Sequence, residues 1–166
     1  KLEIPITVFE SNIFEVTTVV DRNPCYLCAK MRRGFLYSKA QELGCNKIAL
    51  GHHYDDAVET FIMNLFNEGR VGCFQPVTYL SRKDLTLIRP MVLAEENVIS
   101  STVRRCNLPI VKSKCPADGV TQRQWTKEWI HTMDKEHPGL KKRLYGALER
   151  GNIDGFTDKE PTRVKE

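Results

Sequence analysis

The stretch KIALGHHYDDAVETFIMNLFNEG, residues 47–69, carries the signals of a strand, a polar turn and a helix in direct succession. Residues 47–52 are typical of a short apolar strand. From residue 55, apolar side chains recur at the spacing of one helix face, and Gly69 follows as a stop; the apolar positions are Val58, Phe61, Ile62, Leu65 and Phe66. A strand that leads through a turn into an amphipathic helix is a building unit of α/β folds.

The rest of the chain alternates between short apolar runs and longer segments with helical spacing. Strands are predicted at residues 4–10, 47–52, 85–92 and 108–111, and helices at residues 26–43, 55–68, 95–107, 121–135 and 138–150. Residues 67–84 carry glycines and a proline and are predicted to form a loop or a β excursion. The alternation predicts an α/β fold with an open, mostly parallel, Rossmann-like sheet and helices on both of its faces.

Length and composition limit the class of protein. A chain of 166 residues corresponds to one domain, and we expect residues 1–151 to belong to it. Residues 152–166 have almost nothing to bury and are expected to form a disordered tail. No apolar run approaches the ~20 residues that span a bilayer, and the first residues, KLEIPITVFE, lack the apolar region of a signal peptide. We therefore expect a cytoplasmic protein that does not act on a membrane.

Polar residues gather where the strand at residues 47–52 ends. In open α/β sheets, ligands bind beyond the carboxyl ends of the strands. Gly51 lets the backbone approach a ligand closely, and His52 and His53 can meet a phosphate or developing charge. Asp55 and Asp56 either cap the following helix or hold Mg²⁺ beside phosphates. An aspartate cap and a hydrogen-bonded histidine are also common structural features, so the pattern alone leaves both interpretations open.

Six cysteines without a secretory signal favour thiols or metal ligands over a disulfide framework. Cys25 and Cys28 form a C-x-x-C pair at the predicted start of a helix, where the helix dipole favours thiolates. Cys115 lies in the basic stretch KSKCPADG, as an exposed thiolate ligand would. The pair alone suits a redox site, a zinc site or an iron–sulfur site, and both metal sites need further ligands. Cys45 and Cys106 are expected to be packing residues.

The sequence contains no recognisable phosphate-binding loop. No glycine-rich strand-to-helix loop of the GxxxxGK or GxGxxG kind occurs in the chain. Either the domain binds no nucleotide, or the part that grips the phosphates lies on the N-terminal side of this chain. The strand predicted as early as residues 4–10 favours the second interpretation.

Residues 25–69, CYLCAKMRRGFLYSKAQELGCNKIALGHHYDDAVETFIMNLFNEG, resemble the central part of the PP-loop tRNA thiolation enzymes, most closely the tRNA 2-thiocytidine synthetase family. The similarity continues through LIRPMV and PIVKSKCPADGVTQRQ to HPGLKKRLYGAL, so that it covers most of residues 24–148. The joint occurrence of the C-x-x-C pair, the following RRG, the GHHxDD turn and a late cysteine is specific to the family, whereas each motif alone is not.

The resemblance implies an adenine nucleotide α hydrolase-like fold and a set of site residues. Three cysteines would bind a [4Fe-4S] cluster, and those that match the family's motif are Cys25, Cys28 and Cys115. Arg32 would approach ATP or the reaction intermediate. Gly51 and Asp56 would line the nucleotide, with Asp55 alongside. Two departures stand out. Lys112 occupies the first position of the family's late C-x-x-C, and the SGGKDS-type PP-loop is absent, so we expect a fold that is incomplete at the N-terminus and a chain that is inactive alone.

The implied reaction is ATP-dependent 2-thiolation of a tRNA pyrimidine. ATP adenylates the C2 carbonyl with the help of Mg²⁺, which turns the oxygen into part of the leaving group AMP. Sulfide from a donor, held on the cluster iron that lacks a protein ligand, then attacks C2. The implied partner is tRNA, and a homodimer is one form that the active enzyme can take. Basic clusters suit contacts to tRNA phosphates: they contain Lys30, Arg33, Arg104, Arg105 and residues 141–143.

Two alternatives compete with this interpretation. A lysidine-type tRNA ligase of the same fold would need the GHHxDD turn, but it would not need Cys25 and Cys28. A zinc-stabilised nucleic-acid-binding module would use the three cysteines and a histidine as a tetrahedral site, because thiolates bind zinc as well as iron.

Overall fold

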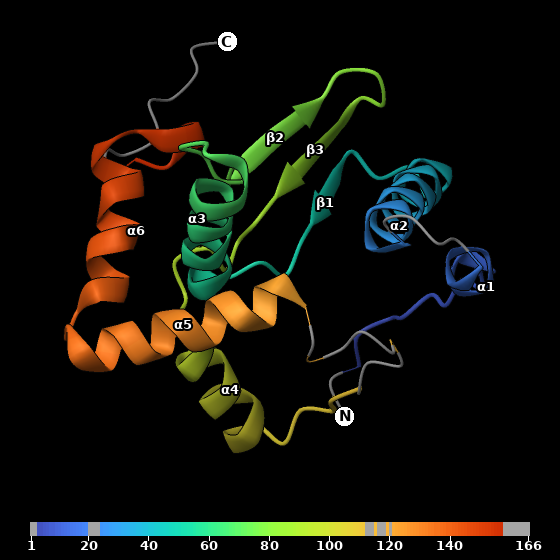
Figure 1. The fold of residues 1–166 in the computed structure, drawn as a ribbon. Coiled ribbons are helices and arrows are strands. Elements are labelled where there is room, and N and C mark those ends of the chain that lie inside the picture. The colour runs from blue at the N-terminus through green and yellow to red at the C-terminus, as the bar shows by residue number, and fades with distance from the viewer. Residues whose placement is uncertain (1–2, 20–23, 112–114, 116–118, 120, 158–166) are drawn as a thin grey trace, which may run out of the picture. The chain divides into compact units, whose positions relative to one another are not determined.

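The computed structural model describes residues 3–19, 24–111, 115, 119 and 121–157. The chain divides into two compact units, Lys1–Ile48 with Leu80–Leu85, and Ala49–Tyr79 with Thr86–Glu166. Figure 1 shows the order of the helices and strands. Of the helices among the described residues, none combines the length and the apolar character that a bilayer span requires.

The first unit contains α1 (Ile13–Thr18) packed against α2 (Pro24–Glu42). Helix α2 confirms the helix predicted at residues 26–43, and it begins at a proline, which suits the first turn of a helix. It ends at Glu42, two residues before Gly44, whose φ of 70° is left-handed, and the Cys45 N–H then bonds to the carbonyl of Ala40 at 2.9 Å. The predicted loop-to-helix transition at Cys25 and Cys28 is therefore the first turn of α2.

The strand predicted at residues 4–10 is wrong, because this segment has no regular secondary structure. Its apolar side chains are largely exposed, with 65% of Ile4, 82% of Ile6 and 81% of Val8 accessible to solvent. Phe9 alone finds an aromatic neighbour, with its ring centroid 6.5 Å from that of Phe35. A β-branched run favours a strand only where another strand offers its backbone, and the sheet has no strand from this segment.

Among the described residues, the sheet has three strands, β1 (Lys47–Ala49), β2 (Val77–Leu80) and β3 (Leu85–Ile88), in the order β1-β3-β2. Strands β1 and β3 begin where strands were predicted but are shorter, and β2 is the β excursion allowed for residues 67–84. Strands β2 and β3 run in opposite directions (Figure 1), so the sheet is smaller and less parallel than predicted. Residues 108–111 form no strand. The α/β class itself is confirmed.

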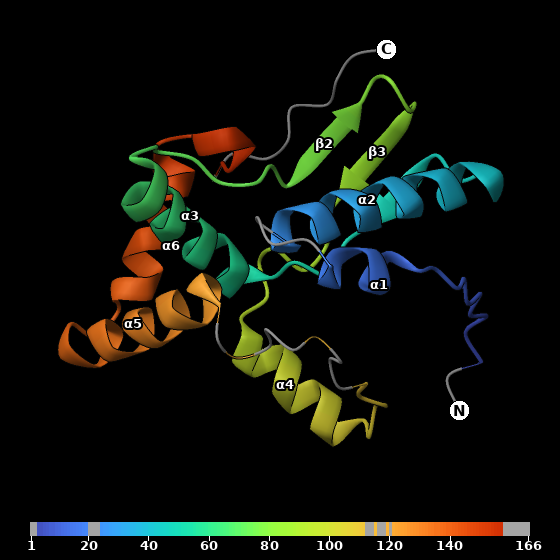
Figure 2. The ribbon, with the colours of Figure 1, turned by 45° about the vertical axis from the view of Figure 1, so that its right-hand side comes forward.

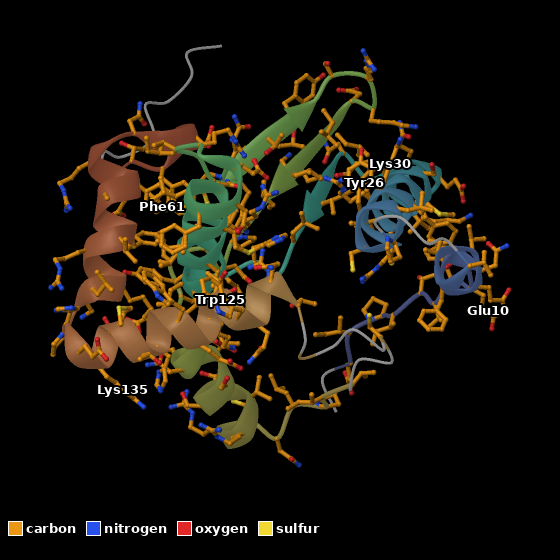
Figure 3. The ribbon with its side chains drawn as sticks, viewed as in Figure 1. Glu10, Tyr26, Lys30, Phe61, Trp125 and Lys135 are labelled. Atoms are coloured by element: carbon orange, nitrogen blue, oxygen red, sulfur yellow. The ribbon has the colours of Figure 1, made fainter. Side chains whose placement is uncertain are left out.

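The core of the second unit lies among α3 (Tyr54–Glu68), α5 (Gln122–Glu136) and α6 (Leu140–Arg150), which contact one another. Figure 2 shows these three helices together, and Figure 3 places Phe61 in the space between α3 and α6. The predicted apolar face of α3 is buried at Val58, Phe61 and Ile62 but exposed at its last turn. Helix α4 (Glu96–Arg105) confirms the helix predicted at residues 95–107 and buries no residue fully.

A local signal marks the end of α3, and the chain stays packed after the end of α6. Helix α3 ends at Gly69, with φ 59°, as its sequence predicts. After α6, the 3-10 helix η1 (Ile153–Gly155) leads to Phe156, which is only 3% exposed and belongs to the core. The packed part of the chain therefore continues beyond the boundary predicted at residue 151, and residues 158–166 of the predicted tail lie outside the described residues.

Leu148 is fully buried in this core. We expect Leu148→Ala to lower the free energy of unfolding by about 2–5 kcal/mol, because it removes buried methyl groups and leaves a cavity. Urea denaturation of the protein measures the loss. Leu93, which is 73% exposed, provides the matched control, and a Leu93→Ala variant as destabilised as Leu148→Ala would contradict this description of the core.

Candidate functional site

The candidate site is built on the turn that joins β1 to α3. The Leu50 N–H bonds to the carbonyl of Ile88 at 2.9 Å, and the Tyr54 N–H bonds to the carbonyl of Ala94 at 3.0 Å. These two bonds tie both ends of the turn to the backbone around β3. Gly51, between them, is exposed, and a side chain at this position would lie 3.6 Å from Met91 Cε. The backbone at Gly51 is thus open to solvent, as the predicted close approach of a ligand requires.

The N-terminus of α3 is closed by a capping box. His53 is the N-cap residue, and its Nδ1 accepts a hydrogen bond from the Asp56 N–H at 3.4 Å. In return, Asp56 Oδ2 accepts a hydrogen bond from the His53 N–H at 2.9 Å. The sequence offers the aspartates as the cap or as magnesium ligands, whereas the structure gives the N-cap position to His53 and uses Asp56 to complete the box.

Asp55 ties three helices together. Its Oδ1 binds Lys141 Nζ, from α6, at 2.7 Å, and its Oδ2 accepts a hydrogen bond from the Glu96 N–H, at the start of α4, at 2.7 Å. Lys141 Nζ also lies 3.5 Å from a carboxylate oxygen of Glu95. Burial raises the pKa of Asp55, but the hydrogen bonds from Lys141 and Glu96 outweigh it and leave the pKa below its ordinary value. Both carboxylate oxygens of Asp55 are thus engaged by groups of this chain.

Asp56 faces a different helix. Its Oδ1 lies 3.3 Å from Arg123 Nη1, on α5, and the same Nη1 binds Glu59 Oε2 at 2.9 Å. Arg123 Nη2 also donates to Thr60 Oγ1 at 3.2 Å. Glu59 is only 4% exposed, and its burial raises the pKa of its carboxyl even though Arg123 opposes the shift. One guanidinium therefore links Asp56 to a buried carboxylate.

His52 presents an unsatisfied buried nitrogen beside this network. Its Nδ1 is inaccessible to solvent and has no hydrogen-bond partner among the described residues. Burial, followed by the positive charge of Arg89, lowers the pKa of His52 and favours the neutral ring. The ring lies 4.9 Å from that of Phe74, and Arg89 covers the same phenyl ring at 4.9 Å. Because this nitrogen is enclosed, the structure does not show it reaching a ligand, and the contact of His52 to a nucleotide stays a prediction.

Asp55 also lines a pocket of about 290 Å³. It contains none of the residues Gly51, His52, His53 and Asp56. Acidic side chains outnumber basic ones in its lining, which is composed of Asp55, Val58, Glu59, Glu96, Gln124, Lys127, Glu128, Ile130, His131, Asp134 and Lys141. An acidic lining disfavours phosphates unless a cation lies between them and the carboxylates.

The predicted metal ligands lie on both units. Cys25 is exposed and Cys28 is half-buried, and their spacing places them on one face of the first turn of α2. Arg32 is exposed one turn further along the same face. Cys115 is exposed and belongs to the second unit. Within the described ranges, no three side chains of His, Cys, Asp or Glu are arranged to hold a metal ion.

The other cysteines divide into two kinds. Cys73 is buried, its Sγ lies 3.5 Å from the carbonyl of Ala57, and burial raises its pKa to about 12. Cys45 and Cys106, predicted to be packing residues, are exposed instead. Cys45 follows the end of α2 and Cys106 is the last cap of α4, where neither side chain points into a core.

Comparison with known proteins identifies the family. Residues 21–131 match the PP-loop domain family. The chain belongs to the PP-loop domain family. This confirms the family predicted from the motifs around Cys25 and Gly51.

Named relatives narrow the likeness further. The chain is 41% identical over 131 residues to the tRNA-cytidine(32) 2-sulfurtransferase of Geobacter sulfurreducens, an alignment that covers 78% of this chain and 50% of that protein. It is 33% identical over 161 residues to the enzyme of the same name from Acinetobacter baumannii, covering 95% of this chain and 54% of that protein. The chain spans about half the length of the curated relatives it matches.

A solved PP-loop protein shares the fold. The U34-tRNA thiolase NcsA from Methanococcus maripaludis, whose structure contains its [4Fe-4S] cluster, superposes with a TM-score of 0.65 and 26% sequence identity. The superposition covers 88% of this chain and 52% of that chain. This PP-loop chain therefore shares the α/β fold of that thiolase.

Sequence reasoning missed the partners of the two aspartates of this PP-loop chain. Lys141 was expected to contact tRNA phosphates, but its ammonium group binds Asp55 and Glu95. Arg123 and Glu59 carried no signal of their own, because a charged residue on an exposed helix face is common and the contact between Arg123 and Asp56 spans 67 residues.

The ion pair of Asp55 and Lys141 predicts a pH-dependent stability. Because the folded state lowers the pKa of Asp55 from 3.8, its contribution is present above that pH and is lost as the pH falls through the folded pKa. We expect Lys141→Met to lower the free energy of unfolding by about 1–3 kcal/mol at pH 7 and by less at an acidic pH below the folded pKa of Asp55, where its carboxylate takes up a proton. Urea denaturation at both pH values measures this, with the exposed neighbour Lys142→Met as control. An equal loss at both pH values would contradict the pairing.

Proposed function

We propose that the full-length protein is an ATP-dependent tRNA thiolation enzyme that exchanges the C2 oxygen of a tRNA pyrimidine for sulfur. The observation that carries the proposal is the joint presence, in one PP-loop chain, of two thiols on the first turn of α2 and a polar turn before α3. The names of relatives that are 33–41% identical support tRNA as the substrate and cytidine as the pyrimidine.

The first step of the proposed reaction is adenylation. The C2 carbonyl oxygen is a poor leaving group, and attack of this oxygen on the α-phosphorus of ATP converts it into a phosphate ester and releases pyrophosphate. Asp56 is the proposed ligand for Mg²⁺ on the phosphates, since a carboxylate oxygen is a preferred magnesium ligand. His52 and His53 are proposed to contact the nucleotide, and the exposed backbone at Gly51 leaves room for it.

The second step needs a sulfur nucleophile. Cys25, Cys28 and Cys115 fit an iron–sulfur cluster in chemistry, because all three are thiols that reach the surface and two of them share a helix N-terminus. Such a cluster, when bound by three thiolates, supplies an iron that can hold sulfide from a donor. Arg32, on the same face of α2 as Cys28, is proposed to stabilise the negative charge of the adenylated intermediate. The remaining features are proposals too: a cytoplasmic location, tRNA contacts through the exposed residues Lys30, Arg33, Arg104 and Arg105, and a homodimer.

Anaerobic purification of the full-length protein tests this function against its two alternatives. A thiolation enzyme carries about four irons with labile sulfide per chain. A colourless protein with one zinc would support the zinc-stabilised binding module instead. A protein with neither metal that transfers lysine to tRNA in the presence of ATP would support the lysidine-type ligase.

A further inference from the structure

The link from Glu59 through Arg123 to Asp56 joins a buried position to the candidate nucleotide site. Arg123 lies in the first turn of α5, and its guanidinium reaches the first two turns of α3. The side chain of Glu59 is 6% exposed, that of Asp56 is 21% exposed, and that of Arg123 is 42% exposed. The link therefore begins in the core and ends at the surface, at a carboxylate that a ligand can reach.

Each contact of Arg123 restricts its guanidinium further. The carboxylate of Glu59 needs a cation, because an unpaired buried charge is costly. The bond to Thr60 Oγ1 at 3.2 Å fixes the second nitrogen and therefore the plane of the group. A lysine at this position would satisfy the charge of Glu59 but would lack the planar fork that reaches three acceptors at once.

Asp56 is held from both sides as a result. Arg123 Nη1 contacts Oδ1, and the His53 N–H contacts Oδ2 at 2.9 Å. A carboxylate fixed in this way loses no freedom when it binds a ligand, which makes binding and reaction more favourable. We propose that Arg123 is a positioning residue that holds Asp56 in the orientation required for Mg·ATP. The proposal rests on the function proposed above, in which Asp56 is the magnesium ligand.

Two variants of Arg123 in the full-length protein test the proposal. Arg123→Lys keeps the positive charge for Glu59 and loses the fork, whereas Arg123→Met loses both. We expect the dissociation constant of Mg·ATP, measured by calorimetry, to rise about 10-fold in Arg123→Lys, and kcat/KM for tRNA-dependent pyrophosphate release to fall about 10–100-fold, because small misplacements of a reacting group have effects of this size. Arg70→Lys is the matched control, because Arg70 pairs only with the exposed Glu68 in the described residues.

A double-mutant cycle separates positioning from direct contact and from a purely structural role. In the Asp56→Asn background, Arg123→Lys should change the Mg·ATP dissociation constant by less than about 2-fold. An equal effect in both backgrounds would overturn the proposal, because Arg123 would then act on the nucleotide itself. Wild-type affinity and activity in Arg123→Lys would overturn it as well, and so would a loss matched by an equal fraction of unfolded protein.

The same measurements distinguish this inference from the proposed function. A wild-type protein that binds Mg·ATP but releases no pyrophosphate with tRNA would contradict the proposed reaction, and the dissociation constants would still decide the role of Arg123. A wild-type protein that binds no Mg·ATP would overturn both.

Discussion

Cys25→Ala and Cys28→Ala are each expected to abolish cluster binding and tRNA thiolation together in the full-length protein. The proposed site holds the cluster by three thiolates. The loss of Cys25 or Cys28 leaves two, which hold a cluster poorly. Iron and labile sulfide should fall from about four atoms of each per chain to the background level. The thiolated nucleoside should disappear from the tRNA of a strain that relies on the variant, as measured by mass spectrometry of digested tRNA.

The chain contains its own controls for these variants. Cys45 and Cys106 are exposed, like Cys25, and lie at the far ends of α2 and α4. Cys45→Ala and Cys106→Ala should keep both the iron content and the thiolated nucleoside. Thiolated nucleoside that persists in the tRNA of a Cys25→Ala strain would refute the assignment of this thiol to the metal site.

Asp56→Ala should keep the cluster and lose adenylation. Asp56 is the proposed magnesium ligand at the phosphates of ATP, where negative charge shifts during the reaction. Removing a group that stabilises such charge typically lowers the rate by about 10²–10³-fold. The measurement is the rate of pyrophosphate release with tRNA and ATP, alongside the iron content of the same preparation.

Asp56 also closes the capping box of α3, so its loss has a structural component of about 1 kcal/mol. Asp56→Asn keeps an oxygen that can accept from the His53 N–H but loses the ion pair with Arg123, so it should be inactive while keeping more of the stability than Asp56→Ala does. Glu136→Ala, at the exposed end of α5, serves as the control for removing an acidic residue. A normal rate of pyrophosphate release in Asp56→Asn would count against the proposed role.

The different roles of Asp55 and Asp56 follow from helix geometry. Successive side chains of a helix point about 100° apart, so two adjacent aspartates face two different neighbours. Asp55 meets Lys141 of α6 and the start of α4, and Asp56 meets Arg123 of α5. Sequence reasoning could name both aspartates, but it could not assign the roles, because the neighbours come from elements 40 or more residues away.

The parts of the fold that the sequence predicted are those with local causes. Helix α3 follows from the spacing of its apolar residues and from Gly69, and helix α2 follows from the helical run that ends at Gly44. Residues 4–10 and 108–111 have the composition of strands, but pairing with another strand decides whether a strand forms, and a single sequence does not contain that information. For the same reason, the sequence predicted only a loop or a β excursion for residues 67–84, which contain β2.

The candidate site could be predicted to a similar degree. The position of the polar turn follows from the end of β1, and the thiol pair follows from its predicted place at the start of a helix, which is the first turn of α2. The N-cap role of His53 is local, but histidine is not among the preferred N-cap residues, so the two aspartates were the stronger candidates. The contacts of Arg123 depend on tertiary packing, so no pattern within a few residues indicates them. The orphaned nitrogen of His52 is likewise visible only once Phe74 and Arg89 have enclosed the ring.

Reconstitution of the reaction tests the central claim most directly. The full-length protein, purified without oxygen, is incubated with unmodified tRNA, Mg·ATP and sulfide, and the tRNA is then digested and its nucleosides are measured by mass spectrometry. The account predicts a 2-thiopyrimidine, most readily 2-thiocytidine, formed with one AMP and one pyrophosphate per sulfur. ATP-dependent attachment of lysine, or tRNA left unchanged by a protein loaded with its metal, would contradict it.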